Sequence, residues 1–149
     1  MADYFTRFSF ILPLKDDAQK EYALSLSHIA SQQRYEETPL PADFPDQLKD
    51  EMEDWTFELE DCEEGIWLHS DSGGINAVCV FVQHLLQQFN PAGCLTFEWS
   101  HDCSKPRVDA YGGGAAIITA AEIKTLNPAD WITSQRPGSQ PPNTSAPTP

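Results

Sequence analysis

The strongest constraint on the fold is an apolar stripe in the middle of the chain. Its members recur at the spacing of one face of a helix, so this stretch is expected to form a helix that buries that face. Asp71-Ser72-Gly73-Gly74 breaks the chain before the helix, and Asn90-Pro91 stops it. The stripe consists of Val78, Val82, Leu85, Leu86 and Phe89.

Alternation of apolar and polar side chains predicts strands on both sides of this helix. From Tyr4 to Leu12, the side chains of Phe8, Phe10 and Leu12 share one face, and Pro13 ends the strand. The other expected strands are Trp55–Leu59, Gly65–His69, Cys94–Ser100 and Ala115–Thr119, with the acidic turn Glu60–Glu64 joining the first two of them.

Further helices are expected from capping residues. Asp16 and Asp17 can cap an amphipathic helix that extends to about Gln33. Thr119-Ala120-Ala121-Glu122 matches a capping box and predicts a short helix after it. Asn127-Pro128 resembles a second helix start, with Trp131 and Ile132 packing onto the body of the protein.

The order strand–helix–strand–strand–helix–strand–strand, followed by a short C-terminal helix, predicts an α+β fold. A mainly antiparallel sheet of about five strands would carry two helices packed on one face. Residues 1–133 are expected to form a single compact domain, in which about 36–54 form an acidic surface connection with a helical turn near Gln47–Met52. Residues 134–149 contain five prolines in 16 residues and are predicted to be a disordered tail.

Composition and the N-terminal sequence predict where in the cell the protein is located. With 40% hydrophobic residues the chain can form a core, and it contains no run of 18 apolar residues that could span a membrane. The N-terminus lacks a basic region followed by an apolar one, which indicates a cytoplasmic protein with reduced thiols.

Negative charge is concentrated in one part of the chain. Residues 36–64 hold 13 of the 23 carboxylates and a single base, Lys49, so their local net charge is 1 − 13 = −12 of a total of −14. Such a surface repels nucleic acid and anionic membranes and attracts a basic protein partner, although acidic loops are also simply solvated in many proteins. The partner-binding residues predicted from this block are Glu51, Glu53, Asp54, Glu58, Glu60, Asp61, Glu63 and Glu64.

His101-Asp102-Cys103 is the motif that most resembles a catalytic site. A cysteine nucleophile needs an imidazole or another cation near its sulfur, and His69 is the other histidine that could approach Cys103. The alternative, a structural loop cysteine, is favoured because adjacent side chains usually point apart. The sequence therefore predicts a protein without catalysis, with Cys103 and His101 as the candidates if there is any.

Gly112-Gly113-Gly114, with Lys105 and Arg107 upstream, forms a candidate anion-binding site. The glycines precede an apolar strand and no lysine follows them, which is the wrong order for a nucleotide-binding loop. The favoured alternative is that they permit a bulge or the close packing of another backbone, and that Lys105 and Arg107 pair with Asp102 and Asp109.

The remaining cysteines and histidines indicate no metal or cofactor. Cys62, Cys79, Cys94 and Cys103 contain no Cys-x-x-Cys pair, and Cys79 falls within the apolar helix as a core residue. His28 and His84 lie off the apolar stripes of their helices and are expected to be solvated.

One part of the chain resembles a known family. The segment Trp99–Arg107 contains Cys-Ser-Lys-Pro-Arg, and Gly112-Gly113-Gly114-Ala115 and Thr119-Ala120 follow it. This combination is similar to a family of small acidic bacterial and phage or plasmid proteins with no assigned activity, over roughly residues 55 to 132. The resemblance implies a single compact domain and a bacterial or mobile-element setting, and it adds no catalytic residue.

Three functions remain open at this level. The first is a non-catalytic interaction protein that binds a basic partner through residues 36–64, as a nucleic-acid mimic or an inhibitor. The second is a small enzyme or anion-binding domain that uses Cys103 with Lys105 and Arg107. The third is an oligomeric accessory module that associates through Ala115–Thr119 as an open sheet edge.

Overall fold

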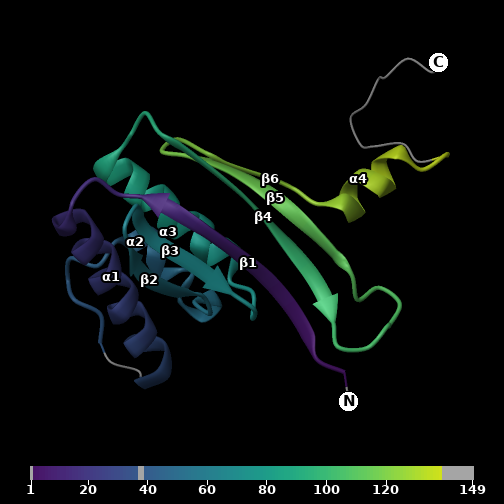
Figure 1. The fold of residues 1–149 in the computed structure, drawn as a ribbon, viewed down its shortest axis with the longest axis horizontal. Helices are drawn as coiled ribbons and strands as arrows, with labels where there is room; N and C mark the ends of the chain where they lie inside the picture. The colour runs from purple at the N-terminus through teal and green to yellow at the C-terminus, as the bar shows by residue number, and fades with distance from the viewer. Residues whose placement is uncertain (1, 37–38, 139–149) are drawn as a thin grey trace.

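The computed structural model describes residues 2–36 and 39–138. Within them, six strands form an antiparallel sheet in the order β2-β3-β1-β4-β5-β6, accompanied by four α-helices and a 3-10 helix, η1 (Figure 1). The elements are β1 Tyr4–Pro13, α1 Asp17–Glu36, α2 Asp46–Lys49, η1 Met52–Asp54, β2 Glu58–Cys62, β3 Gly65–Ser70, α3 Ile75–Phe89, β4 Cys94–Cys103, β5 Gly112–Thr119, β6 Ile123–Leu126 and α4 Pro128–Gln135.

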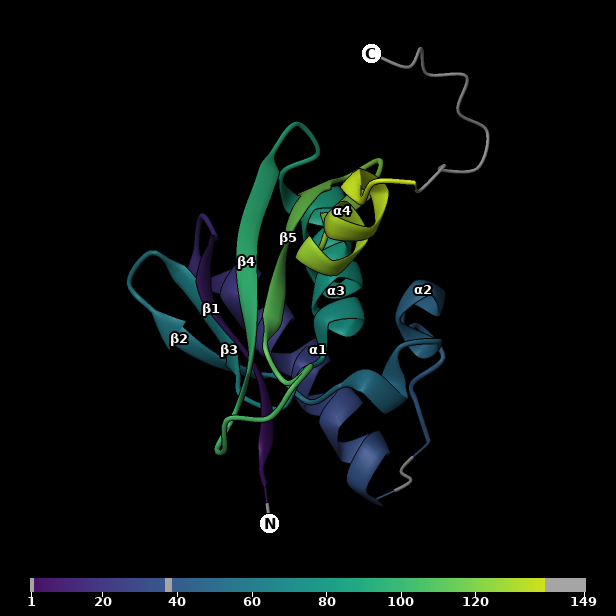
Figure 2. The same cartoon turned by 90° about the vertical axis from the view of Figure 1, so that its right-hand side faces the viewer.

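The sheet is covered on one face only. Helices α1 and α3 lie on that face, and no described helix lies over the other (Figures 1 and 2). The core between the layers includes Phe8 of β1, Phe97 of β4 and Phe81 of α3, each at most 6% exposed. On the open face, Ile11 and Ile117 are 41% and 48% exposed.

This arrangement confirms the α+β class and the mainly antiparallel sheet, with one strand more than predicted. The additional strand is β6, which lies where the capping box predicted a helix. Thr119 Oγ1 does accept a hydrogen bond from the Glu122 backbone N–H, at 3.1 Å. Here the bond closes a turn between β5 and β6 and does not start a helix. Ile123 is already a strand residue, which pairs with Ile118 and packs against the core. Ala115–Thr119 is therefore not an open edge, and that prediction is wrong.

The acidic connection is more buried than the sequence indicated. Phe44, Leu48 and Met52 are 4%, 0% and 8% exposed. They recur every fourth residue, which is the spacing of one helical face. The predicted helical turn is present as α2 followed by η1. The segment thus packs against the core through these three side chains and carries acidic residues on its outer side, so it is more than a surface connection.

Several strand boundaries also differ from the prediction, and two of them bear on the candidate sites. β2 begins at Glu58, and Trp55 instead follows η1 as a core residue that is 1% exposed. β4 extends to Cys103, so His101 lies in a strand and not in a loop. Both shifts arise because pairing with a neighbouring strand decides where a strand begins and ends, and local alternation cannot reveal that pairing.

The C-terminal helix α4 begins where Asn127-Pro128 predicted. Asn127 Oδ1 accepts a hydrogen bond from the Asp130 backbone N–H at 2.8 Å, which caps the helix. The helix continues through Ser134 and Gln135, so the predicted tail cannot begin at 134, and most of that tail lies outside the described residues. Trp131 is 58% exposed, so its expected packing onto the body is also wrong.

His84 is buried, contrary to the expectation that it is solvated. It is 6% exposed, and its Nε2 lies 2.7 Å from the Tyr22 hydroxyl. Burial lowers the pKa of His84 and, with Asp43 as a second cause, raises the pKa of Tyr22. The pair therefore joins α1 to α3 by a hydrogen bond.

This pair predicts a loss of stability in mild acid. Because the folded state holds the pKa of His84 below its ordinary value of about 6.5, the unfolded chain takes up the proton first as the pH falls. The free energy of unfolding should decrease as the pH falls below about 6.5, until the folded pKa is reached. Urea unfolding at several pH values should show a smaller decrease in His84→Gln. Replacement of the exposed His28 in His28→Gln is the control, and equal pH dependence of both variants would contradict this account.

Candidate functional site

The acidic hairpin of β2 and β3 is the candidate site. β2 is an outermost strand of the sheet, and its only strand partner in the described chain is β3. Its acidic side chains are open to solvent: those of Glu58, Glu60 and Asp61 are 76%, 56% and 66% exposed. Glu63 and Glu64 occupy the turn to β3, and both are exposed. We call these five residues the acidic edge.

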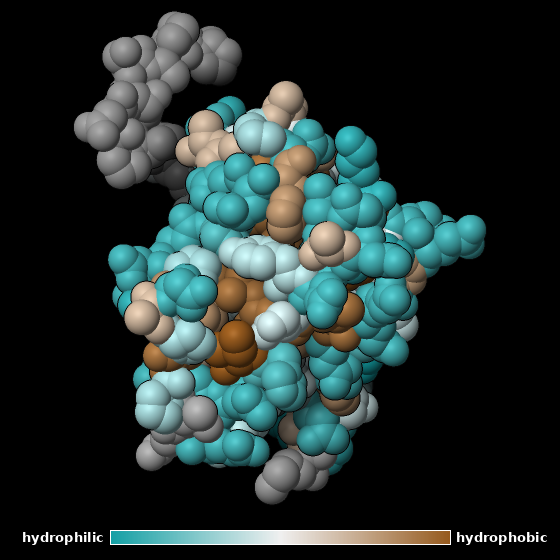
Figure 3. All heavy atoms as spheres, turned by 90° about the vertical axis from the view of Figure 1, so that its left-hand side faces the viewer, coloured by the Kyte–Doolittle hydropathy of each residue, from teal (hydrophilic) through white to brown (hydrophobic). Residues whose placement is uncertain are grey.

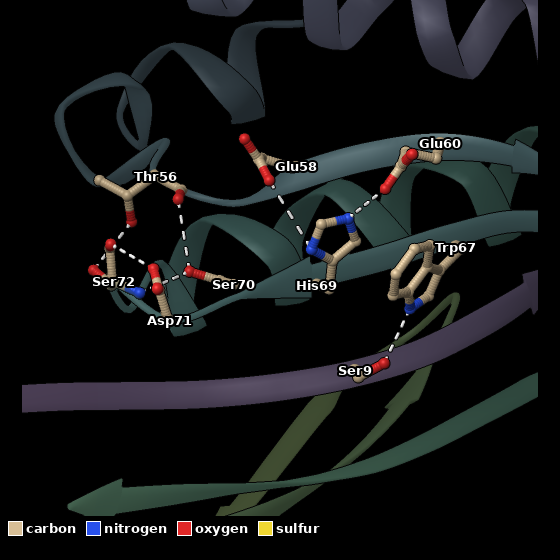
Figure 4. Close-up of polar contacts among 9 residues, drawn as sticks. All are labelled: Ser9, Thr56, Glu58, Glu60, Trp67, His69, Ser70, Asp71 and Ser72. Atoms are coloured by element: carbon tan, nitrogen blue, oxygen red, sulfur yellow. Dashed lines mark hydrogen bonds and ion pairs between the residues drawn. The ribbon is translucent and has the colours of Figure 1, made fainter.

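His69 stands beside two members of the acidic edge and contacts Glu60 directly (Figure 4). Its Nε2 lies 2.7 Å from Glu60 Oε2, and its Nδ1 lies 3.7 Å from Glu58 Oε2. The ring stacks on Trp67 at a centroid distance of 4.0 Å, and the Trp67 indole N–H donates to Ser9 Oγ at 2.7 Å. The imidazole therefore holds the Glu60 carboxylate on the open face of the sheet, and the Glu58 carboxylate stands nearby.

This arrangement follows from the pleat of the hairpin. Glu58 is paired with His69 and Glu60 with Trp67, so all four side chains project to the same side. The sequence prediction missed this arrangement because it ended the strand at Leu59 and placed Glu60 in the turn, whereas β2 extends from Glu58 to Cys62. The alternation of Glu58 with Glu60 and of Trp67 with His69 was the available signal, but it required the register.

Lys20 of α1 ties the hairpin to the helical layer. Its Nζ lies 3.2 Å from Asp61 Oδ1 and donates to the Cys62 carbonyl at 2.8 Å. The Lys20 side chain is only 15% exposed, so this contact is better shielded from solvent than a surface ion pair. The end of β2 near the turn is thereby held against α1.

Among the three predicted acids upstream of β2, Asp54 makes a side-chain contact within the fold. Asp54 Oδ2 accepts a hydrogen bond from the Ala77 backbone N–H at 3.2 Å, which caps α3 from outside the helix. The backbone carbonyl of Glu53 accepts a hydrogen bond from Arg34. The pKa of Glu51 is raised, mainly by partial burial of its carboxyl group and to a lesser extent by the negative charges of Asp54 and Asp50. The carboxylate of Asp54 is therefore already engaged in a hydrogen bond within the protein.

A groove runs between the acidic edge and α1. Its volume is about 530 Å³. Leu24, Ser27, His28 and Ser31 line it from α1, and residues 57–60 line it from the sheet. A second hollow, of about 440 Å³, lies between the end of β1 and α3. Figure 3 shows apolar atoms gathered in a hollow on the face of the molecule where α1 lies, with hydrophilic residues around them.

The polar groups of the candidate catalytic motif have partners other than Cys103. The His101 Nδ1 lies 2.8 Å from the Thr6 hydroxyl, and Arg7 pairs with Asp102 at 3.0 Å. No hydrogen bond joins His101 to Cys103 among residues 2–36 and 39–138. His69 lies on β3, with β1 between it and β4, and contacts the acidic edge instead. The arrangement offers no His–Cys pair.

The glycine run has a packing role. Gly112–Gly114 lie within β5 opposite Trp99–His101 of β4. A Cβ on Gly114 would collide with the Trp99 indole ring and stand 2.8 Å from the Leu126 carbonyl oxygen. The close approach that the sequence favoured is thus present.

The two bases beside the glycine run make no ion pair in the structure. The described part of the chain contains no ion pair of Lys105 or Arg107 within 4.0 Å, and Asp102 is taken by Arg7. The expected pairing of these bases with Asp102 is therefore wrong.

The cysteines form no site with other ligands. All four are free, and burial, with Glu51 as a lesser cause, raises the pKa of Cys79 to about 12. Cys79 is thus a core residue, as predicted. Within the two described ranges, no group of three or more His, Cys, Asp or Glu residues could hold a metal ion. Among the described helices, none is long and apolar enough to cross a lipid bilayer.

Comparison of the chain with models of protein families, with curated proteins and with solved structures finds no match.

Proposed function

We propose that this protein is a non-catalytic interaction protein that binds a basic protein partner through the acidic edge. The observation that carries the proposal is the gathering of Glu58, Glu60, Asp61, Glu63 and Glu64 on one exposed strand and its turn. Carboxylates aligned on one edge attract a basic surface more strongly than the same charges dispersed over the molecule. The contact with His69 reduces the entropy that the Glu60 side chain would lose on binding.

The proposal also explains the uneven charge of the protein. The acidic residues protect β2 from pairing with another acidic or apolar edge, which is a structural role of charge on edge strands. The same carboxylates favour a partner with lysine or arginine at the contact. A partner that itself binds nucleic acid is a special case, in which the carboxylates stand in place of phosphates.

Binding of a fluorescent lysine homopeptide tests the proposal. In low salt, of about 50 mM, we expect binding to weaken by about tenfold when four carboxylates of the acidic edge are neutralised, in Glu58→Gln/Glu60→Gln/Glu63→Gln/Glu64→Gln. Binding of the unaltered protein should also weaken steeply towards about 200 mM salt, because the attraction is electrostatic. Fluorescence anisotropy measures both effects.

The matched control removes the same charge elsewhere. Asp3→Asn/Glu21→Gln/Glu98→Gln/Glu122→Gln also changes the net charge from −14 to −10, by removal of four negative charges. This control should bind nearly as well as the unaltered protein. Equal weakening of both variants would mean that only overall charge matters, and absence of binding in low salt would overturn the proposal.

A further inference from the structure

The free edge of β2 has unused backbone hydrogen-bonding groups. At the ends of this stretch, Ser70 donates to the Thr56 carbonyl at 3.3 Å and Lys20 donates to the Cys62 carbonyl. Between them, the groups of 58–61 that point away from β3 make no backbone hydrogen bond in the described chain. Such an edge can accept an extended segment of another chain as an additional strand.

The two sides of this edge differ in chemistry. On the open face of the sheet, Glu58 and Glu60 stand beside His69. On the opposite face lies the groove between β2 and α1, where the half-buried Leu24 and Leu59 give apolar surface among the polar side chains of Ser27, His28 and Ser31. Side chains of an added strand would alternate between the two sides, because successive residues of a strand point to opposite faces.

We propose that the free edge of β2 accepts an extended segment of a basic protein as a seventh strand, in which lysine or arginine alternates with small apolar residues. The basic side chains lie opposite Glu58 and Glu60, at the short separation of a cross-strand pair. The apolar side chains enter the groove against Leu24 and Leu59. This inference rests on the proposed function and adds the mode of binding.

Charge complementarity decides the occupant. A second copy of this chain would bring the carboxylates of one acidic edge against those of another, and like charges opposite each other destabilise a strand pair. The lysine–apolar alternation satisfies both sides of the edge at once. A segment without that alternation satisfies only one of them.

The experiment uses three synthetic peptides of about eight residues with alternating lysine and valine. One is unmodified, and the other two carry backbone N-methyl groups on every lysine or on every valine. N-methylation removes hydrogen-bond donors from one edge of an extended peptide. If the peptide forms a strand, only one methylated edge faces β2, so one methylated peptide should bind at least about tenfold more weakly and the other should not. Amide exchange of those N–H groups within Glu58–Asp61 that point away from β3, measured by NMR, should slow when the unmodified peptide binds, whereas the N–H groups already bonded to β3 should change little.

The outcomes separate this inference from the function on which it rests. Loss of binding for one methylated peptide, together with slowed exchange, supports strand addition. Equal binding of all three peptides, with unchanged exchange at Glu58–Asp61, would overturn strand addition and leave the acidic edge as a binding surface for basic partners. No binding of any of the three peptides or of the lysine homopeptide in low salt would overturn both.

Discussion

Replacement of Gly65 by alanine is expected to lower the free energy of unfolding by about 3 kcal/mol or more. Gly65 begins β3 and pairs with Pro13 at the end of β1. A Cβ at this position would stand against the Leu12 carbonyl oxygen and 2.6 Å from the Leu14 backbone nitrogen. Both obstacles are backbone atoms, so strands β1 and β3 would have to separate to make room. Urea unfolding followed by tryptophan fluorescence measures the effect.

Gly73→Ala is the matched control for this prediction. Gly73 has a φ of 91°, and nothing lies within 4 Å of the place where its Cβ would be. Its replacement should cost only the strain of a left-handed backbone, about 1–2 kcal/mol. A loss in Gly65→Ala no larger than that in Gly73→Ala would show that the sheet does not need the close approach of β1 and β3. Since Gly65 follows the acidic turn, its variant should also weaken binding at the acidic edge.

The second large effect is expected for Trp55→Ala, at about 3–5 kcal/mol of unfolding free energy. Trp55 is 1% exposed, and its ring centroid lies 4.9 Å from that of Phe57 and 5.3 Å from that of Phe81. Its indole N–H donates to Ser27 Oγ of α1 at 3.2 Å. Truncation would leave a large cavity between the acidic connection, the sheet and both long helices. Urea unfolding monitored by far-UV circular dichroism gives the difference.

Trp131→Ala removes the same side chain from an exposed position. Trp131 is 58% exposed on α4, so its loss should change the unfolding free energy by no more than about 0.5 kcal/mol. Comparable destabilisation in the two variants would contradict the assignment of Trp55 to the core. Ser27→Ala should cost about 1–3 kcal/mol, because it leaves the buried Trp55 N–H without its acceptor.

The helices and strands with strong periodicity were predictable because their patterns are local. α3 extends over the apolar stripe and ends before Asn90, and β1 ends at Pro13 as its sequence indicated. The failures arose where pairing between strands overrode a local signal. Thr119 and Glu122 made the expected hydrogen bond, but pairing with β5 turned the following residues into β6.

The acidic residues of the candidate site were predictable as a set, but their roles were not. Asp54 caps α3 and Asp61 pairs with Lys20, whereas Glu58 and Glu60 stand beside His69 on the open face. These differences depend on which elements meet in space. His101 and Cys103, two residues apart in β4, lie opposite different residues of β1, Thr6 and Tyr4, which only the strand register reveals.

The sequence by itself determined the α+β class, the helix α3, the capping of α4 and the concentration of charge in residues 36–64, because each depends on residues near one another in the chain. The tertiary structure alone decided that β2 is an outermost strand, that His69 holds Glu60 with Glu58 nearby, and that the groove beside α1 adjoins them. Strand order and register arise from the packing of the whole core, and no local pattern specifies them.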